Sequence, residues 1–222
     1  MDFSLFPLWN SLRIAFFSSI FILIFGILLA YYICKTPRIV KGILDVVFTL
    51  PLILPPTVSG YILIKIFGNN SPIGQFFYSI GFPFYMDWKG AILASIIVAF
   101  PLMYRTVRAS FEAFDENLVF AGKTLGLSNS YIFWRIRIPA CKNGIIAGIV
   151  LAFARALGEY GATSMFVGYI EDETSTIATS VYHYWTIDEN ALAAIWITIN
   201  IAIAAIVLLG INFFEKSERR KA

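Results

Sequence analysis

The hydrophobic positions of the chain fall in long blocks, and most charged residues lie in the short segments between them. A block of roughly 20 apolar residues is what a helix needs to cross about 30 Å of hydrocarbon. The pattern therefore predicts an all-α integral membrane protein with about five transmembrane helices. No repeat or linker interrupts it, so residues 1–222 are expected to form a single transmembrane domain. The expected spans are about residues 12–34, 42–67, 90–110, 143–168 and 191–214.

The composition excludes a water-soluble globule of this size. The chain is 59% hydrophobic and 14% charged, whereas about 25% of the residues of a soluble domain are charged. The first block is longer than the roughly 7–15 residues of a signal-peptide core, and no basic stretch precedes it, so we expect a retained span. The basic residues form no stripe that would follow a phosphate backbone, which argues against nucleic acid as a partner. The excess apolar surface is expected to face a lipid bilayer.

The Lys and Arg residues of the connecting segments predict the orientation, because short cytoplasmic loops carry an excess of them. The segments after the first and third spans are basic, whereas residues 68–89 contain one basic residue and residues 168–190 contain none. We therefore expect the N-terminus outside the membrane and the C-terminus in the cytoplasm. The C-terminal tail is basic through Lys216, Arg219, Arg220 and Lys221.

The longest cytoplasmic segment, residues 112–142, has the pattern of two short helices. Leucine and alanine recur at helical spacing as far as Gly126, which ends the run. Ser128 can cap a second helix, and Pro139 marks the start of the fourth span. An amphipathic connector on the headgroups and a docking element for a cytoplasmic partner both fit this pattern. The aromatic residues of the loop, which favour docking, are Tyr131, Phe133 and Trp134.

The second span contains a proline cluster that no continuous helix accommodates. Each of Pro51, Pro55 and Pro56 removes a backbone donor, and the freed carbonyl groups must find other partners. Broken backbone at membrane depth is tolerated where it borders a cavity or is buried in protein. The cluster therefore predicts either a break that lines a pathway or a structural kink.

The fourth span contains two ionisable residues, Arg155 and Glu159. Such residues cost about 2.5–3.5 kcal/mol each at the centre of a span, so they normally face a cavity or a partner. One helical turn separates the two, and they can pair with each other. A structural ion pair and a role in lining or gating an anion path both remain open. Gly158 and Gly161 beside them allow close helix packing or a bend.

Four segments resemble the permeases of ATP-binding-cassette (ABC) importers. The loop resembles the family pattern of Glu-Ala-Ala, a glycine four residues later and a final Ile-x-Leu-Pro, although Phe120, Gly122 and Ile138 depart from it. Residues 50–60, 100–108 and 152–163 resemble the molybdate and tungstate branch of that family. The similarity covers nearly the whole chain.

The resemblance implies the type I ABC importer permease fold, with residues 112–142 as a cytoplasmic coupling loop. It also implies a homodimer in a bacterial or archaeal cytoplasmic membrane, two cytoplasmic ATPase subunits and an external substrate-binding protein. The candidate coupling residues are Ala121, Gly122, Gly126, Ser128, Tyr131, Ile136 and Pro139. The candidate residues of the translocation pathway or its gate are Pro55, Pro56, Thr57, Arg155, Glu159, Gly161 and Thr163.

The expected function is import of molybdate or tungstate, with this chain as the permease subunit of an ATP-driven complex. No nucleotide-binding loop of the form Gly-x-x-x-x-Gly-Lys-Ser/Thr is present, so ATP and Mg²⁺ are expected on the partner ATPase subunits. We expect no cofactor, metal site or catalytic residue on this chain, and its one histidine, His183, has no Cys or His neighbours in the sequence. A sulfate importer is the nearest alternative, and an ATP-independent anion channel or carrier is a second. The residues do not rank molybdate against tungstate.

Overall fold

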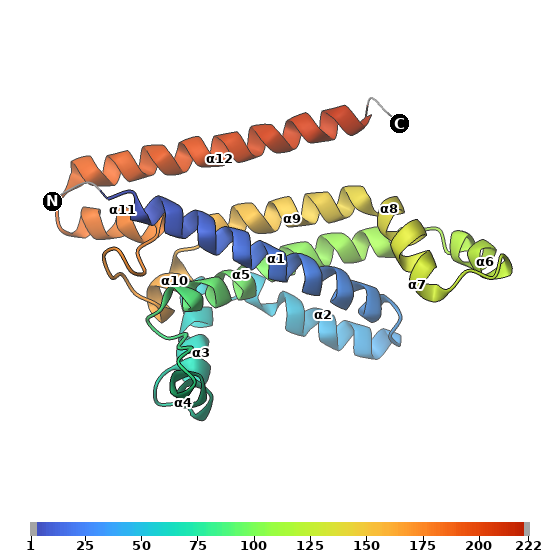
Figure 1. Ribbon diagram of the computed structural model, residues 1–222, viewed down its shortest axis with the longest axis horizontal. Helices are drawn as coiled ribbons and strands as arrows, with labels where there is room; N and C mark the ends of the chain where they lie inside the picture. The colour runs from blue at the N-terminus through green and yellow to red at the C-terminus, as the bar shows by residue number, and fades with distance from the viewer. Residues whose placement is uncertain (1–3, 220–222) are drawn as a thin grey trace.

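The computed structural model describes residues 4–219, with side chains as far as residue 207 and at Leu209. All regular structure in this range is helical. Three helices are long and apolar enough to cross a membrane: α1 (Phe6–Cys34), α5 (Trp88–Glu112) and α12 (Asn190–Arg219), the last judged on residues 190–207. They run roughly along one direction (Figure 1). Two bent helix pairs raise the number of possible spans to five, in agreement with the predicted all-α membrane fold.

The centre of the bundle is formed by α1, α5 and α9 (Lys142–Leu157). Several alanines of these helices are fully buried. An added Cβ at Gly26 of α1 would lie 2.6 Å from Met103 Cγ, and one at Gly148 of α9 would lie 2.7 Å from the Met103 sulfur. In a membrane, helices associate through such close packing rather than through the hydrophobic effect. The small residues therefore allow the three helices to form one tight core.

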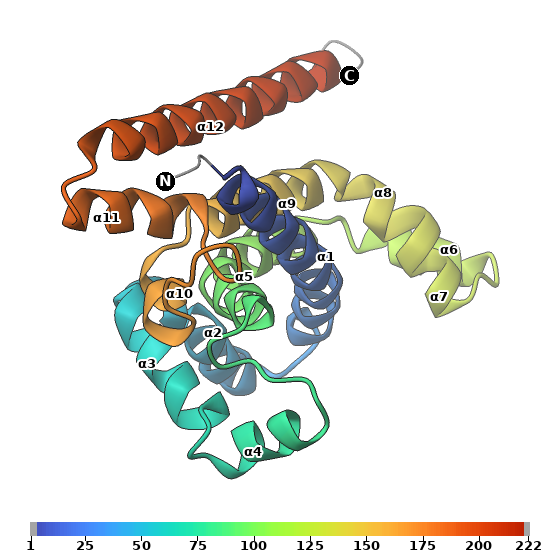
Figure 2. The same ribbon diagram turned by 60° about the vertical axis from the view of Figure 1, so that its left-hand side comes forward.

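The helix α12 lies apart from this core (Figure 2). Only 11% of its apolar segment, residues 190–207, is buried. It packs on α11 (Ile177–Thr186), where Ile177, Tyr184 and Trp196 form a separate small cluster. Most of its apolar surface is therefore available to lipid or to a second chain. The side chains of the basic tail expected at the C-terminus, Lys216 to Lys221, are not among those that the structure describes.

The expected second span, residues 42–67, consists of two helices that are bent by 112°. They are α2 (Arg38–Ile53) and α3 (Pro56–Phe67). Leu54 and Pro55 separate the two helices. Leu54 has an extended backbone, with φ of −67° and ψ of 140°, because the proline that follows it disfavours helical backbone. Together with α4 (Pro72–Ser79), α3 projects from the side of the bundle (Figures 1 and 2). Pro55 and Pro56 therefore produce a sharp break and a change of direction, whereas Pro51 is accommodated inside α2.

The expected fourth span, residues 143–168, is not one helix either. The helix α9 ends at Leu157, and α10 (Gly161–Phe166) starts after a short non-helical segment. A second bend, of 71°, lies before α9, between residues 129–140 and 142–157. Gly158 is the C-cap residue of α9. The continuous helix of this span therefore begins close to the expected residue, but it ends about ten residues before the expected end.

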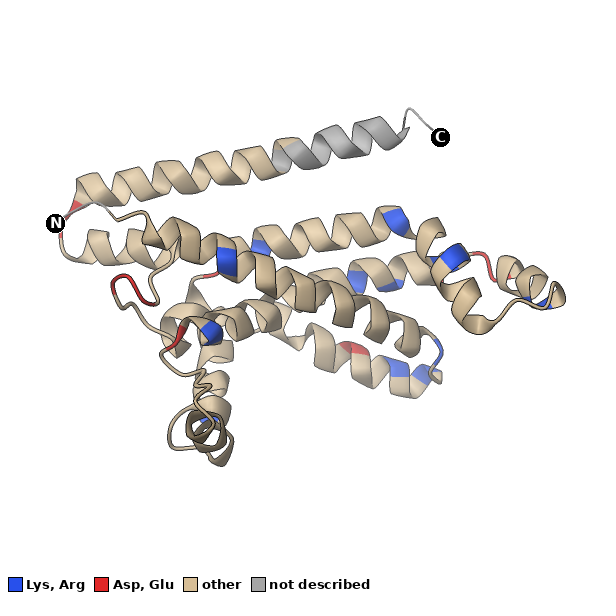
Figure 3. Ribbon diagram, viewed as in Figure 1, with Lys and Arg blue, Asp and Glu red and all other residues tan. Residues whose placement is uncertain are grey.

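The coupling loop forms helices that extend beyond one end of the bundle (Figure 1). They are α6 (Asn117–Thr124), α7 (Asn129–Ile132), the π-helical turn η1 (Phe133–Arg137) and α8 (Ile138–Ala140). Many Lys and Arg residues lie at this end, and the acidic loop before α11 lies at the opposite end (Figure 3). The two chain termini also lie at opposite ends of the bundle (Figure 1).

Candidate functional site

The first helix of the coupling loop, α6, ends in a Schellman motif around Gly126. The N–H of Leu127 donates to the carbonyl of Gly122 at 3.0 Å, and the N–H of Gly126 donates to the carbonyl of Lys123 at 2.9 Å. These bonds satisfy carbonyl groups that a helix end leaves unpaired. The motif needs a left-handed residue, and Gly126 has a φ of +75°. Glycine adopts this backbone without a steric penalty, so the turn is encoded locally.

The second helix of the loop starts at Ser128, whose Oγ accepts a hydrogen bond from the N–H of Tyr131 at 3.2 Å. This is the N-cap expected from the sequence. Ile132 is buried and packs on Gly122, where an added Cβ would lie 3.2 Å from two Ile132 carbons and 3.6 Å from one of Ile136. Glycine at 122 therefore brings α6 and α7 into direct contact.

Arg137 joins the two ends of the coupling loop to each other and contacts α1 of the bundle, a role that the sequence did not predict. Its Nη2 lies 2.6 Å from Glu116 Oε1, and 7% of its side chain is exposed. Its guanidinium stacks over the rings of Phe114, at 4.7 Å, and Tyr31, at 5.6 Å. It also lines a cavity of about 370 Å³ between the loop and the end of α1. The burial of Arg137 could have been predicted from its position four residues after Phe133, because that spacing puts both residues on one helix face.

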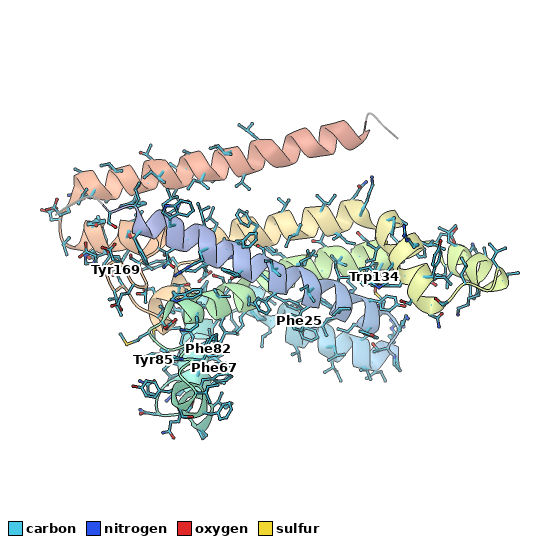
Figure 4. The ribbon with its side chains drawn as sticks, viewed as in Figure 1. Phe25, Phe67, Phe82, Tyr85, Trp134 and Tyr169 are labelled. Atoms are coloured by element: carbon cyan, nitrogen blue, oxygen red, sulfur yellow. The ribbon has the colours of Figure 1, made fainter. Side chains whose placement is uncertain are left out.

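Phe133 also differs from expectation, because it belongs to the core rather than to an exposed docking surface. Its ring lies 4.4 Å from that of Tyr31, and the residue is 7% exposed. Its neighbours Tyr131 and Trp134 are exposed, and Trp134 is labelled in Figure 4. Among the other candidate coupling residues, Ala121 and Pro139 are exposed and Ile136 is half-buried.

Five large apolar side chains of the loop are exposed, three of them on α6 or at its C-cap and two on the helical turns that follow it. We name this surface the apolar tip. Its side chains are between 46% and 78% exposed, which is unusual for large apolar groups at the end of a helix bundle. The apolar tip consists of Leu118, Phe120, Leu125, Tyr131 and Trp134.

The two breaks in the predicted spans lie against each other. An added Cβ at Gly161, at the start of α10, would lie 2.8 Å from Pro56 Cβ and 3.4 Å from Thr57 N, at the start of α3. An added Cβ at Gly60 would lie 2.8 Å from the carbonyl oxygen of Ala162. We name this contact the α3–α10 junction. Pro55 and Thr57 are exposed on it, whereas Thr163 is buried behind it, with 2% exposure.

Arg155 and Glu159 form an ion pair beside this junction. Arg155 Nη1 lies 2.6 Å from Glu159 Oε2, and the two side chains are 30% and 1% exposed. The other carboxylate oxygen accepts a hydrogen bond from the N–H of Ala162 at 2.7 Å. The buried carboxylate therefore links the end of α9 to the start of α10, and the guanidinium remains partly accessible. The pairing expected from the sequence is present, and an accessible cation accompanies it.

Among the side chains that the structure describes, no group of three or more His, Cys, Asp or Glu residues is placed to hold a metal ion. His183 instead stacks on Tyr169, with ring centroids 4.0 Å apart.

Long membrane helices, two bent helix pairs and a helical loop beyond one end make up a fold that is found in ABC importers. The fold is shared with a bacterial ABC transporter involved in the import of the acidic polysaccharide alginate, with a TM-score of 0.76 and 16% identity over 96% of this chain and 79% of that chain. The chain belongs to the family of binding-protein-dependent transport system inner membrane components, whose model matches residues 22–222.

Two relatives show how far this similarity extends. The chain is 40% identical over 222 residues to the molybdenum transport system permease protein ModB of Escherichia coli (strain K12), covering 97% of each sequence. It is 30% identical over 205 residues to a probable sulfate transport system permease protein, cysT, of Chlorokybus atmophyticus, covering 92% of this chain and 72% of that protein. The resemblance inferred from the sequence is therefore confirmed, and the chain is a multi-pass inner-membrane permease.

Proposed function

We propose that this chain is the permease subunit of an importer of molybdate or tungstate. In this proposal two copies form the membrane part, two ATPase subunits bind on the cytoplasmic side, and a substrate-binding protein delivers the oxyanion outside. The apolar tip is the observation that carries the proposal, because it presents five large apolar side chains on a folded loop beyond the membrane helices. The higher identity to a molybdenum permease than to a sulfate permease favours molybdate or tungstate.

The structure of the loop suits a docking element. Gly126 and Ser128 shape its two helices by local hydrogen bonds. Arg137 pairs with Glu116 within the loop and stacks on Tyr31 of α1, which connects the loop to the bundle. A rigid loop can transmit a displacement of the ATPase subunits to the membrane helices, whereas a flexible connector on the headgroups would deform instead. Phe120 stands where the family has an acidic residue and is 62% exposed, so we propose that this position makes an apolar contact with the ATPase in place of an ion pair.

The α3–α10 junction is the proposed translocation site. It combines non-helical backbone, which membrane proteins tolerate where it lines a cavity, with a partly accessible arginine. A tetrahedral dianion would meet Arg155, Thr57 and the start of α3 there. The net charge of the Arg155–Glu159 pair is zero, which suits weak and transient binding, since a transported ion must also leave.

The proposed orientation places the coupling loop in the cytoplasm and the N-terminus outside. It is supported by the basic residues at the loop end of the bundle and the acidic loop at the other end (Figure 3). Accessibility labelling of Tyr131→Cys in intact cells tests it, since the thiol should react only after the membrane is permeabilised.

The function is tested by reconstituting the chain in vesicles with its ATPase and binding protein. Molybdate or tungstate should stimulate ATP hydrolysis and enter the vesicles, and excess sulfate should not compete. Competition by sulfate would establish the sulfate alternative, which rests on the relative from Chlorokybus atmophyticus. Oxyanion flux through the purified chain without ATPase would instead establish a channel or carrier.

A further inference from the structure

A network of charged side chains joins α2 to α5, away from both the apolar tip and the α3–α10 junction. Asp45 of α2 contacts the guanidinium of Arg108 and the hydroxyl of Tyr104, both on α5. One turn away, Lys41 of α2 contacts Glu112 of α5. Arg108 Nε also lies 3.7 Å from Glu112 Oε1. Opposite charges therefore alternate one turn apart on both helices, and each meets its complement on the other helix.

This network is a main attachment of α2 to the bundle. None of the residues of α2 is fully buried, and its outward residues, such as Ile43 and Val46, are more than 60% exposed. Apart from the charges, α2 meets α5 through Phe48, whose ring lies 5.6 Å from that of Phe100 and 5.5 Å from that of Tyr104. Leu44 of α2 also packs against the core of the bundle, so the charges and these apolar side chains hold the helix in place together.

The two helices that the network joins lead to two other parts of the molecule. At one end of it, α5 terminates at Glu112, and Glu116 follows within one turn to pair with Arg137 of the coupling loop. On the other side, α2 leads within ten residues of Asp45 to Pro55, where α3 begins and meets α10. The network thus lies between the coupling loop and the break in the second span.

We propose that Asp45, Tyr104 and Arg108 are positioning residues for transport, which make α2 and α5 move as one rigid body. A displacement of the coupling loop would then reach the break at Pro55 and Pro56 through α5 and α2. Ionisable residues in a span are expensive and normally functional, and charge networks between rigid helices can carry coupling between distant sites. The inference rests on the proposed function, because it assumes that the coupling loop is displaced by an ATPase.

The first test measures uptake per ATP hydrolysed by the reconstituted transporter. In the double variant Asp45→Asn/Arg108→Gln no unpaired charge is left at this pair, so the chain should still insert and assemble. Its uptake per ATP should fall about 2- to 30-fold, which corresponds to roughly 0.5–2 kcal/mol of coupling free energy between the sites. A matched control reverses all four charges, as Lys41→Glu, Asp45→Arg, Arg108→Asp and Glu112→Lys. This variant keeps every opposite-charge contact and should restore uptake per ATP to within about threefold of the original value.

The second test measures rigidity directly and does not depend on the transported ion. Spin labels at Ile43→Cys and Ala109→Cys, with Cys34→Ala and Cys141→Ala, report the distance between α2 and α5 in the complex with the ATPase. The distance distribution should be narrow and equal with and without ATP, and it should broaden in the neutral double variant. Ile43 is 61% exposed, so the label should not disturb packing there.

The outcomes separate the two proposals. Three outcomes would each overturn the rigid-body inference. The neutral double variant could keep its uptake per ATP, or the charge-reversed variant could assemble normally and still be uncoupled. The distance between α2 and α5 in the original chain could also change with ATP. A different result would overturn only the proposed function. In that case the complex shows no oxyanion-stimulated uptake, but the distance distribution between α2 and α5 is narrow and broadens in the neutral double variant.

Discussion

The coupling loop and the α3–α10 junction both depend on a glycine, but for opposite reasons. Gly126 has a φ of +75°, and nothing lies within 4 Å of an added Cβ. An added Cβ at Gly161 would lie 2.8 Å from Pro56 Cβ, although its backbone is not left-handed. The loop therefore needs glycine for its own backbone, and the junction needs it for close approach of a distant segment. One region is shaped by local chemistry and the other by tertiary packing.

The largest effect is expected at the junction, from Glu159→Ala. This substitution removes both the partner of Arg155 and the acceptor of the Ala162 N–H. We expect a loss of about 3 kcal/mol, near the lower limit for breaking a buried pair, because the Arg155 side chain is 30% exposed. Thermal unfolding of the purified chain in detergent measures it. Glu159→Gln retains the acceptor for Ala162 and should lose less, and equal melting temperatures for both variants and the original would contradict the proposed link.

The close packing at the junction predicts a slightly smaller loss of stability for Gly161→Ala than for Glu159→Ala. The added methyl group would overlap Pro56, and overpacking of this kind typically costs about 1–3 kcal/mol. Oxyanion uptake should fall together with the melting temperature, because α3 and α10 are forced apart. Gly42→Ala is the matched control, since nothing lies within 4 Å of an added Cβ at Gly42. A junction variant that behaved like this control would show that the close approach is not required.

The coupling loop should respond in function rather than in stability. Asn and Asp both tolerate the left-handed backbone, so Gly126→Asn and Gly126→Asp differ mainly in a charge beside the apolar tip. We expect Gly126→Asp to lose ATPase stimulation and uptake by at least about tenfold, equivalent to about 1.4 kcal/mol of binding free energy. Membrane insertion should remain intact, and Gly126→Asn should retain most activity. Normal transport by Gly126→Asp would remove the loop from the mechanism.

The smallest effect is expected for Ser128→Ala. Loss of the N-cap hydrogen bond to Tyr131 should destabilise the start of α7 by about 1 kcal/mol. Hydrogen exchange of residues 129–132 should accelerate about fivefold, while the melting temperature of the bundle stays nearly unchanged. Ser128→Asp preserves an acceptor and should exchange at the original rate. A global loss of stability in Ser128→Ala would mean that the loop is not a local unit.

Several features of the fold and site follow from the chain alone because their causes are local. Long apolar blocks predict membrane helices, Pro55 and Pro56 predict a broken span, and Gly126 with Ser128 predicts two short helices. The ion pair of Arg155 and Glu159 follows from their spacing of one helical turn. Such features depend on backbone sterics, helix geometry and hydration, which act within a few residues.

Other features could not be foreseen, since they depend on which distant segments meet. The end of α9 at Leu157, within an apolar stretch, is stabilised by a carboxylate that caps the next helix. The burial of Phe133 and Arg137 depends on Tyr31, about one hundred residues away. A single sequence shows that a charge lies in a span, but its partner on another helix is visible only in three dimensions.

The amino-acid sequence by itself determined that the chain is a helical membrane permease with a loop of short helices over residues 112–142, because solvent, helix length and turn chemistry are read from neighbouring residues. The tertiary structure alone decided that the two breaks form one junction, that α2 is held to α5 by alternating charges, and that Arg137 anchors the loop. Packing and ion pairing between helices depend on distances in space, and chain order does not specify those distances.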